Sequence, residues 1–433
     1  MLIVGSGAAG LFCALKLQSQ LRVLLITKKK ITDCNSHLAQ DGIAVVTDET
    51  DKSSFIADTL AAGQHENDIA AVNLLAERAI PVLSELGALG VPFSKTENGQ
   101  FSYAKDCLHS KARIVQAGDE TGRHLIETLE KHLRVRQNVT IWEDAVLLDI
   151  LEYTRNGQKA CAGALVQKDD KIKKVKCHQT VLACGGVGGL FRNTTNHATI
   201  TGDAIAIAHH HGVEIRDLNR MQFHPTALYE SDCAERRFLI SGALRCEGAR
   251  LLNPANEEFI EPQASRDVVT AAIRAQMKRF HSPYVYLDIS ARDRFFILER
   301  FPMIYKKCLS AGYEITFGPF PVSPAQHIFM GGISVDRRGR TSMAHLYAVG
   351  ETSCTGAHGA NCPSGNALLE ALVYGAAAAE DINAVLSSAI AQDPFPRRFV
   401  TNEHLLNELY KENLLKTLLI GENAALYDEL FER

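Results

Sequence analysis

The first ten residues, MLIVGSGAAG, constrain the fold of this chain more than any other stretch. Apolar residues typical of a short buried strand run into glycines spaced G-x-G-x-x-G, and a helical pattern over 8–18 begins at once. The first glycine permits the tight turn, the second lets the backbone approach a pyrophosphate, and the third lets helix pack on strand. The free N–H groups of the helix then face the anion. The stretch predicts a dinucleotide-binding α/β fold, with an ordinary glycine-rich turn as the alternative.

Length and composition narrow the class of protein. The 433 residues suffice for two or more domains, and the net charge of −4 gives no basic surface for nucleic acid. No apolar run has the length of a membrane span, and the first strand starts at Leu2, which leaves no room for a signal peptide. The eleven cysteines lack CxxC pairs and zinc-like spacing, as in reduced core residues. We therefore expect a cytoplasmic protein without nucleic-acid or membrane partners.

The end of the second predicted strand, over 22–27, departs from the usual dinucleotide pattern. Many such folds carry Asp or Glu there to hold ribose hydroxyls, whereas Thr27 and Lys28 stand here. This argues against an NAD-dependent dehydrogenase. Lys28 either faces the phosphates of the dinucleotide or belongs to a solvated charge run over 28–30.

The rest of the chain mixes helical and strand-like patterns. Residues 87–119 look irregular, 140–183 resemble a β-meander, and 219–330 have a mixed α+β character. Because strand-like runs return at 331–350, the mixed segment is interpreted as an insertion. Helices are predicted over 54–62, 69–86, 121–132, 201–211 and 366–385, with one or two more in 393–433. The successive histidines 209–211 fan roughly 100° apart on a helix, so we expect no metal site.

Several motifs are more specific than the glycine turn. They include QFHPTALY (222–229), PAQHIFMGGISVD (324–336) and LYAVGETSCTGAHGAN (346–361). On these residues the chain resembles the flavoprotein family of L-aspartate oxidase, succinate dehydrogenase and fumarate reductase, from residue 2 to about 381. Within the family it is most similar to a short form of the L-aspartate oxidases.

The resemblance implies a fold and an activity. The fold is a Rossmann-like FAD-binding domain in two parts, 1–218 and 331–390, with a capping α+β domain inserted at 219–330 and a short C-terminal helical tail over 391–433. The activity is the FAD-dependent oxidation of L-aspartate to iminoaspartate in NAD (quinolinate) biosynthesis. Oxygen or fumarate would take the electrons, and quinolinate synthase is a candidate partner.

The resemblance also implies how FAD is held. Membrane-bound relatives carry a histidine that bonds FAD covalently five residues before the loop glutamine, and Asn35 stands there in this chain. We therefore expect non-covalent FAD, since His37 is two residues out of register. The implied FAD-binding residues are Gly5, Ser6, Gly7, Ala8, Ala9, Gly10, Lys28, Asn35, Ser36, His37, Leu38, Ala39, Gln40, Asp41, Gly42, Asp203, Glu351, Ala367 and Leu368.

A second group of residues matches the family's substrate site. His224 and His327 match its two substrate-binding histidines and lie near the two ends of the insertion, and Ser241 matches a hydroxyl donor. Arg266 matches the arginine that transfers a proton. Imidazole can donate to a carboxylate. A guanidinium fork also matches carboxylate geometry, so a purely binding role for Arg266 stays open.

Other positions depart from the family pattern. Cys362 replaces an arginine that grips a substrate carboxylate, and Gly242 replaces a relay glutamate. His124 replaces an acidic residue that orients the amino group of aspartate, and Asp41 replaces a loop glycine beside the flavin. His124 and Cys362 remain candidates for the substrate site. Two alternative functions stay open: a fumarate reductase-like oxidoreductase acting on another carboxylic acid, and a catalytically degenerate FAD-binding protein.

Overall fold

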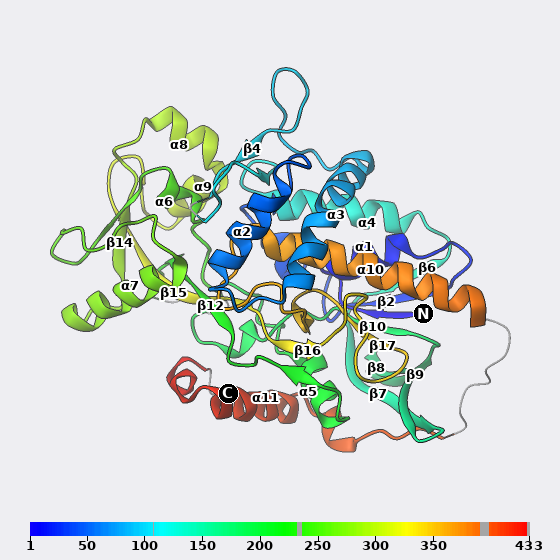
Figure 1. Cartoon of the computed structure of the whole chain (residues 1–433). Coiled ribbons are helices and arrows are strands. Elements are labelled where there is room, and N and C mark those ends of the chain that lie inside the picture. Colours follow the sequence, from blue (N-terminus) through cyan, green and yellow to red (C-terminus); the bar gives the residue numbers. More distant parts are fainter. Residues whose placement is uncertain (107, 232–235, 390–397, 431–433) are drawn as a thin grey trace.

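A five-stranded parallel sheet forms the centre of the molecule, which we describe from a computed structural model (Figure 1). The structure describes residues 1–106, 108–231, 236–389 and 398–430. The strand order is β17-β10-β1-β2-β6, and each neighbouring pair is parallel. The strands are β1 (Leu2–Val4), β2 (Val23–Ile26), β6 (Val139–Trp142), β10 (Thr180–Leu182) and β17 (Leu346–Ala348).

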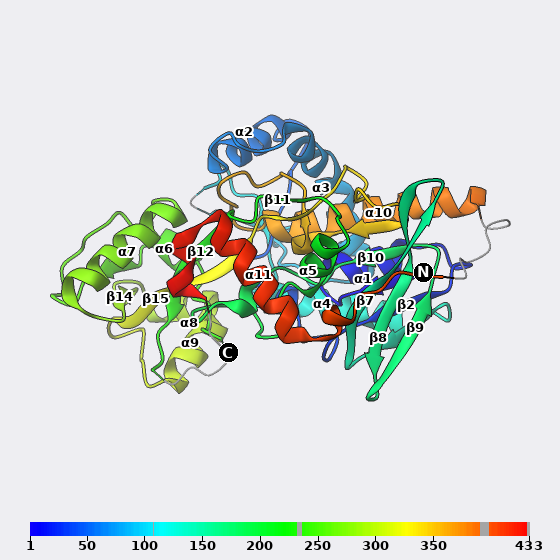
Figure 2. The ribbon, with the colours of Figure 1, turned by 90° about the horizontal axis from the view of Figure 1, so that it is seen from below.

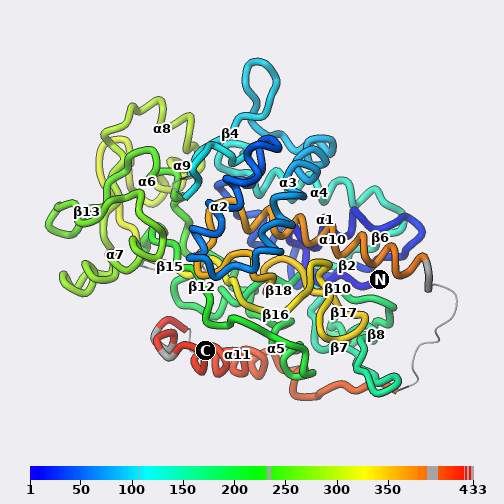
Figure 3. The backbone as a smooth tube through the Cα atoms, in the orientation of Figure 1, coloured from blue at the N-terminus to red at the C-terminus, as the bar shows by residue number. Residues whose placement is uncertain are grey.

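Both faces of this sheet are covered, as is usual for parallel strands. Alternate residues of β1 separate the two sides: Ile3 packs in one apolar cluster, whereas Leu2 and Val4 pack in another. One cluster holds helices far apart in sequence, and α1 and α10 lie side by side (Figure 3). These helices are α1 (Ala8–Lys16), α3 (Ile69–Leu89), α4 (Thr121–Arg134) and α10 (Asn366–Ala389), with α2 (Lys52–Ala62) packed on α3.

The glycine turn after β1 is as tight as its sequence predicts. Gly5 has a φ of +114°, and a Cβ atom there would lie 1.9 Å from the carbonyl oxygen of Ala183. A Cβ atom on Gly10 would lie 2.2 Å from the carbonyl oxygen of Gly5. The predicted roles of these glycines in the turn and in helix packing are therefore met by the structure.

The opposite face is covered by α5 (Asp203–His210) and an antiparallel three-stranded sheet. That sheet consists of β7 (Ala145–Arg155), β8 (Gln158–Lys168) and β9 (Lys171–Lys176). The prediction of one meander over 140–183 is wrong at both ends, because β6 and β10 belong to the parallel sheet. Strands of three or four residues are too short for their periodicity to reveal which sheet they join.

A second lobe lies to one side of the central sheet (Figure 1). Its antiparallel sheet has the order β12-β15-β14-β13, and one apolar cluster draws all its buried residues from 228–322. This cluster supports the proposed capping unit at 219–330. The strands are β12 (Met221–Leu228), β13 (Arg250–Leu252), β14 (Val285–Asp288) and β15 (Phe320–Phe329). The helices are α6 (Ala243–Cys246), α7 (Arg266–Phe280), α8 (Arg294–Arg300) and α9 (Pro302–Ser310).

Short elements complete the fold. The segment predicted to be irregular contains β4 (Tyr103–Ala104) and β5 (Ile114–Val115). These two strands form a small sheet with β3 (Ile43–Ala44), in which β5 pairs with both β3 and β4. A further sheet contains β11 (Ile215–Arg216), β16 (Gly332–Ser334) and β18 (Ser353–Cys354). The 3₁₀ helices are η1 (Asn35–Leu38), η2 (Gly188–Leu190), η3 (Gly350–Thr352), η4 (Glu403–Leu406) and η5 (Ala424–Glu429).

The C-terminal segment contains α11 (Glu408–Glu422), which packs on α5 and lies across the molecule toward the second lobe (Figure 2). Leu415 and Leu419 are fully buried there. The start of the predicted tail, at 391–397, lies outside the described residues. Within the described ranges, no helix combines the length and apolar character needed to cross a membrane.

Candidate functional site

A cavity of about 370 Å³ opens where the parallel strands end. It is lined by the residues that follow β1, β2, β10 and β17, by η1, and by the start of α10. Carboxyl ends of parallel strands meet at one edge of a sheet, where such folds bind nucleotides. Of the predicted FAD-binding residues, those that line this cavity are Gly5, Ser6, Gly7, Ala8, Ala9, Lys28, Asn35, Ser36, His37, Leu38, Ala39, Gln40, Asp203, Glu351, Ala367 and Leu368. Gly10, Asp41 and Gly42 do not line it.

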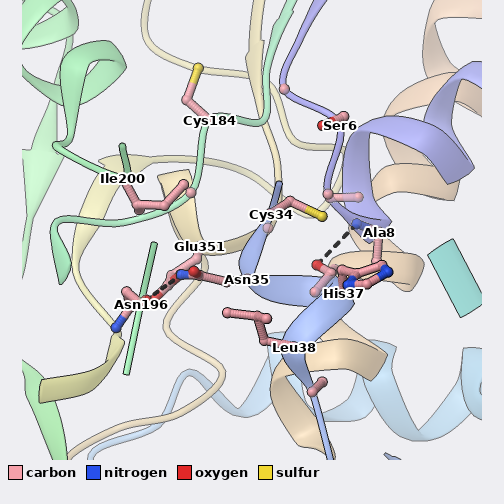
Figure 4. Close-up of a pocket in the computed structure, with 18 of the residues that line it drawn as sticks. Ser6, Ala8, Cys34, Asn35, His37, Leu38, Cys184, Asn196, Ile200 and Glu351 are labelled. Atoms are coloured by element: carbon pink, nitrogen blue, oxygen red, sulfur yellow. Dashed lines mark hydrogen bonds between the residues drawn. The ribbon is translucent and has the colours of Figure 1, made fainter. Parts of the chain in front are cut away.

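The N-terminus of α1 faces this cavity (Figure 4). Its N-cap, Gly7, has no capping side chain, and the first turn holds no acidic residue. The Ala8 amide donates to Ser36 Oγ at 3.1 Å, which fixes η1 against the turn. An uncapped helix start beside a glycine cradle suits a pyrophosphate, so the residues present fit a dinucleotide.

Lys28 reaches into the same cavity and is not part of a solvated charge run. Its Nζ atom lies 2.9 Å from Asp203 Oδ2 and 3.6 Å from Glu408 Oε1. Burial opposes the charge of Lys28, but the two carboxylates outweigh it and raise the pKa of the lysine. The lysine therefore stays charged beside the cavity.

Asn35, Asn196 and Glu351 meet beside this cavity (Figure 4). The Asn35 side chain donates to Asn196 and accepts from the His197 amide at 3.1 Å, so it is held by protein partners. Glu351 accepts from the Phe329 amide at 2.7 Å. Burial raises the pKa of Glu351 to about 7.

The two predicted substrate histidines come together at the edge of this cavity. His224 lies on β12 and His327 on the paired strand β15, and their ring centroids are 5.2 Å apart. His327 lines the cavity, and its Nδ1 atom lies 2.8 Å from Thr195 Oγ1. The antiparallel pairing of the two ends of the second lobe therefore joins residues 103 positions apart in the sequence, by the difference of their numbers.

Both imidazoles are uncharged at neutral pH. Burial, with Arg266 and His327 nearby, holds the pKa of His224 well below its usual range. Burial, with Arg266 nearby, lowers the pKa of His327 to about 3. The Nε2 atom of His224 is buried without a hydrogen-bond partner among the described residues. It is thus available to a ligand.

Arg266 begins α7 and is almost fully buried. Its Nη1 donates to Gln222 Oε1 at 2.7 Å and its Nη2 to Ser364 Oγ at 2.6 Å. Nη2 also lies 3.6 Å from Asp41 Oδ2. The Ser364 hydroxyl lies 3.0 Å from Asp106 Oδ2 and can donate to it. A chain of hydrogen bonds therefore leads from Arg266 to a partly exposed carboxylate.

The other predicted substrate residues lie in different surroundings. Ser241 donates to Asp41, which places it in the same cluster as Arg266. Cys362 is fully buried, and its thiol donates to the Pro363 carbonyl at 3.4 Å. His124 lies half-buried on α4, and neither it nor Cys362 lines the cavity. Their substrate role stays a prediction.

Sequence reasoning missed other members of this cluster, namely Gln222, Ser364, Asp106 and Arg245. Gln222 lies within the motif 222–229, which was a usable signal, whereas Ser364 lies just beyond the motif 346–361. Asp106 lies in the segment that looked irregular, and Arg245 lies on α6, a helix of only four residues. Burial lowers the pKa of Arg245 to about 10, with Arg266 as the next cause.

The fold and this site define an FAD-dependent oxidoreductase of the flavoprotein type. The FAD binding domain family model matches residues 1–368. The L-aspartate oxidase of Clostridium acetobutylicum is 45% identical over 387 residues, which cover 89% of this chain and 88% of that protein. The L-aspartate oxidase of Clostridium perfringens is 43% identical over 431 residues, which cover 99% and 95%.

Solved structures agree with the sequence comparison. A structure of Escherichia coli quinol fumarate reductase superposes with a TM-score of 0.82 at 26% identity, covering 97% of this chain and 74% of that chain. The chain belongs to the L-aspartate oxidase family within the FAD-binding flavoproteins, and its cofactor is FAD.

Proposed function

We propose that this protein oxidises L-aspartate to iminoaspartate in NAD biosynthesis and works in the cytoplasm. The observation that carries the proposal is the pair of uncharged histidines beside Arg266, at the edge of the cavity that fits FAD. Bound FAD supplies the hydride acceptor, and Asn35 at the attachment position supports non-covalent binding. Oxygen or fumarate accepts the electrons, and quinolinate synthase takes the unstable product.

The chain's own residues would bind and orient an amino-dicarboxylic acid. Neutral imidazole N–H groups on His224 and His327 can donate to a carboxylate without the cost of burying another charge. Nδ1 of His224 lies 3.1 Å from the Thr226 carbonyl and 3.3 Å from the Thr226 amide, and Nε2 carries the proton when Nδ1 accepts from the amide. Gln222 and Ser364 hold the Arg266 guanidinium in one orientation.

Arg266 is the proposed proton acceptor. Arginine is a weak general base because its ordinary pKa lies above about 12. It can therefore accept a proton from the substrate only as it passes one of its own protons to a neighbouring group. Ser364 and Asp106 lie next along the hydrogen-bond chain, and this arrangement supports that role.

The decisive experiment is anaerobic mixing of the FAD-loaded protein with L-aspartate while the flavin absorbance is followed. We expect L-aspartate to bleach the flavin band and D-aspartate to leave it unchanged. Unbleached flavin with L-aspartate at millimolar concentration would contradict the proposal.

A second function, oxidation or reduction of another carboxylic acid, is favoured by one observation. The Cys362 thiol is buried against Pro363, so the usual arginine contact to a carboxylate is missing. If succinate or another acid bleaches the flavin and L-aspartate does not, this second function is correct.

A further inference from the structure

We propose that Arg245 grips a carboxylate of the substrate, in place of the arginine that the chain lacks at position 362. This inference rests on the proposed function and names the residue that holds one end of the substrate. Among the described residues, it is carried by a buried guanidinium that has no carboxylate within 4.0 Å, beside a buried histidine nitrogen that has no hydrogen-bond partner.

The first observation is the isolation of the Arg245 guanidinium. Arg245 is 3% exposed, and no carboxylate among the described residues forms an ion pair with it within 4.0 Å. Asp106 and Asp41 lie farther away, and burial and the neighbouring Arg266 outweigh them, so that the pKa of Arg245 falls to about 10. Its Nη1 donates to the Pro262 carbonyl at 2.6 Å, which orients the group, and its Nε has no partner there. A buried cation is costly unless it is paired. The natural complement of this guanidinium is therefore an anionic ligand.

The second observation is that the Nη2 atom of Arg245 and the unpaired Nε2 atom of His224 both border the position that a side chain of residue 242 would take. A Cβ atom on Gly242 would stand 3.5 Å from Arg245 Nη2 and 3.9 Å from His224 Nε2. The φ of Gly242 is −57°, so its backbone does not require glycine. A side chain at this position would be in contact with these atoms, so glycine leaves its volume free. A carboxylate in this space could accept from Arg245 and from His224 together.

The other buried arginine of this cluster, Arg266, already has partners within the protein. Arg266 donates to Gln222 and Ser364 and lies near Asp41. Asp106 Oδ2 would lie 3.8 Å from the same Cβ atom, on the flank of the space. The space is thus bordered by the guanidinium of Arg245 and the carboxylate of Asp106. An amino acid fits these charges, because its carboxylate can pair with Arg245 and its ammonium group with Asp106.

The test measures ligand affinity separately from turnover. The FAD-loaded wild type, Arg245→Gln and Arg245→Lys are titrated with succinate and L-aspartate under anaerobic conditions. Binding is followed by calorimetry and by the flavin difference spectrum. We expect the Gln variant to bind about 30-fold more weakly or worse, as when a buried charge pair loses one partner. The Lys variant should regain part of this loss.

Arg250→Gln is the matched control, because it removes one positive charge from an exposed position of the same lobe. It should bind both ligands like the wild type. FAD retention and melting temperature identify any variant that fails to fold. If Arg245→Gln does not fold, a second pair of variants tests the inference.

That pair is Gly242→Glu and Gly242→Ala. A glutamate would place its own carboxylate against Arg245 and compete with the ligand, so we expect weaker binding than in the alanine variant. Equal or tighter binding in Gly242→Glu, or wild-type affinity in a folded Arg245→Gln, would overturn the inference. A wild type that L-aspartate does not reduce, but that binds succinate through Arg245, would instead contradict the proposed function alone.

Discussion

At the scale of single residues, the groups available to bind an acid are neutral imidazoles and buried guanidinium groups. The low pKa of His327, about 3, follows first from burial and then from Arg266. Acidification to pH 5 therefore does not charge this ring. Positive charge for binding an acid comes instead from Arg245, because arginine ordinarily keeps its proton at physiological pH.

Replacement of Arg266 tests its proposed role in proton transfer. In Arg266→Leu, we expect FAD to be retained, because Arg266 does not line the FAD cavity. Flavin reduction by L-aspartate should slow by about 100-fold or more, the lower range for a lost acid–base group. Stopped-flow reduction at saturating L-aspartate measures this step. Wild-type reduction kinetics would remove Arg266 from the mechanism.

Glu351 makes FAD binding sensitive to pH. Its pKa of about 7 in the free protein is raised by burial, so the free protein holds a proton there below pH 7. Hydroxyl groups of bound FAD that donate to the Glu351 carboxylate would lower its pKa. FAD binding would then release the proton. We expect FAD affinity to rise between pH 6 and pH 8, measured by fluorescence titration. Glu351→Gln should remove this dependence, and an unchanged slope in that variant would refute the assignment.

The sequence motifs predicted most of the residues that line the cavity. They did not predict the residues that join the site only because the fold brings distant segments together. The glycine turn and residues 35–40 are contiguous, so their spacing carries the information. Arg245 and Asp106 belong to separate segments and meet only around Gly242. No pattern along the chain indicates such a meeting.

At the scale of elements, a buried histidine joins α5 to β7. His211 follows α5 and lies 2.8 Å from both Asp149 and Glu152, which belong to β7. Burial opposes its charge, but the two carboxylates raise its pKa above the usual value. His211, the last of the three successive histidines, thus supplies a structural contact between two layers.

This contact has a defined dependence on pH. Because the folded pKa of His211 is raised, its stabilisation is complete below the unfolded pKa and is lost as pH rises through the folded pKa. His211→Gln should cost about 3–5 kcal/mol of unfolding free energy at pH 6, since two buried carboxylates lose their partner. The deficit should shrink at pH 9. Denaturant unfolding at the two pH values gives the comparison, and an equal deficit at both would contradict it.

The helix α11 stabilises the same layer. Leu419 is fully buried against the cluster that contains α5. We expect Leu419→Ala to cost about 2–5 kcal/mol, the range for a buried leucine. Leu409→Ala is the control, because that side chain is 47% exposed. Thermal unfolding should separate the two variants, and equal melting temperatures would contradict this packing.

Long helices could be placed from sequence, and short strands could not. The prediction over 121–132 agrees with α4, where Leu125, Ile126 and Leu129 are buried on one face. Strands β4 and β5 have two residues each and depend on their partners. Their pairing is a property of the fold, so local pattern does not reveal it.

At the scale of the whole molecule, contacts between distant segments define the site. The C-terminal segment contacts both the FAD-binding part and the second lobe. Its Glu408 lies near Lys28 beside the FAD cavity, and its Glu429 pairs with Arg274 of α7 at 2.7 Å. The recognised motifs predicted the order of the two parts. They could not predict these bridges, because the recognised motifs include no residue of 391–433.

The order of strands in the central sheet also determines when the protein can fold during its synthesis. The strand β1 pairs with β10, and β10 pairs with β17 at 346–348. At about 5–20 residues per second, a ribosome needs roughly 20–70 s to make the chain to that point. Until then β10 lacks its partner strand β17. We therefore expect the yield of soluble protein to depend on chaperones and on growth temperature, because the emerging polypeptide stays exposed to aggregation for most of its translation.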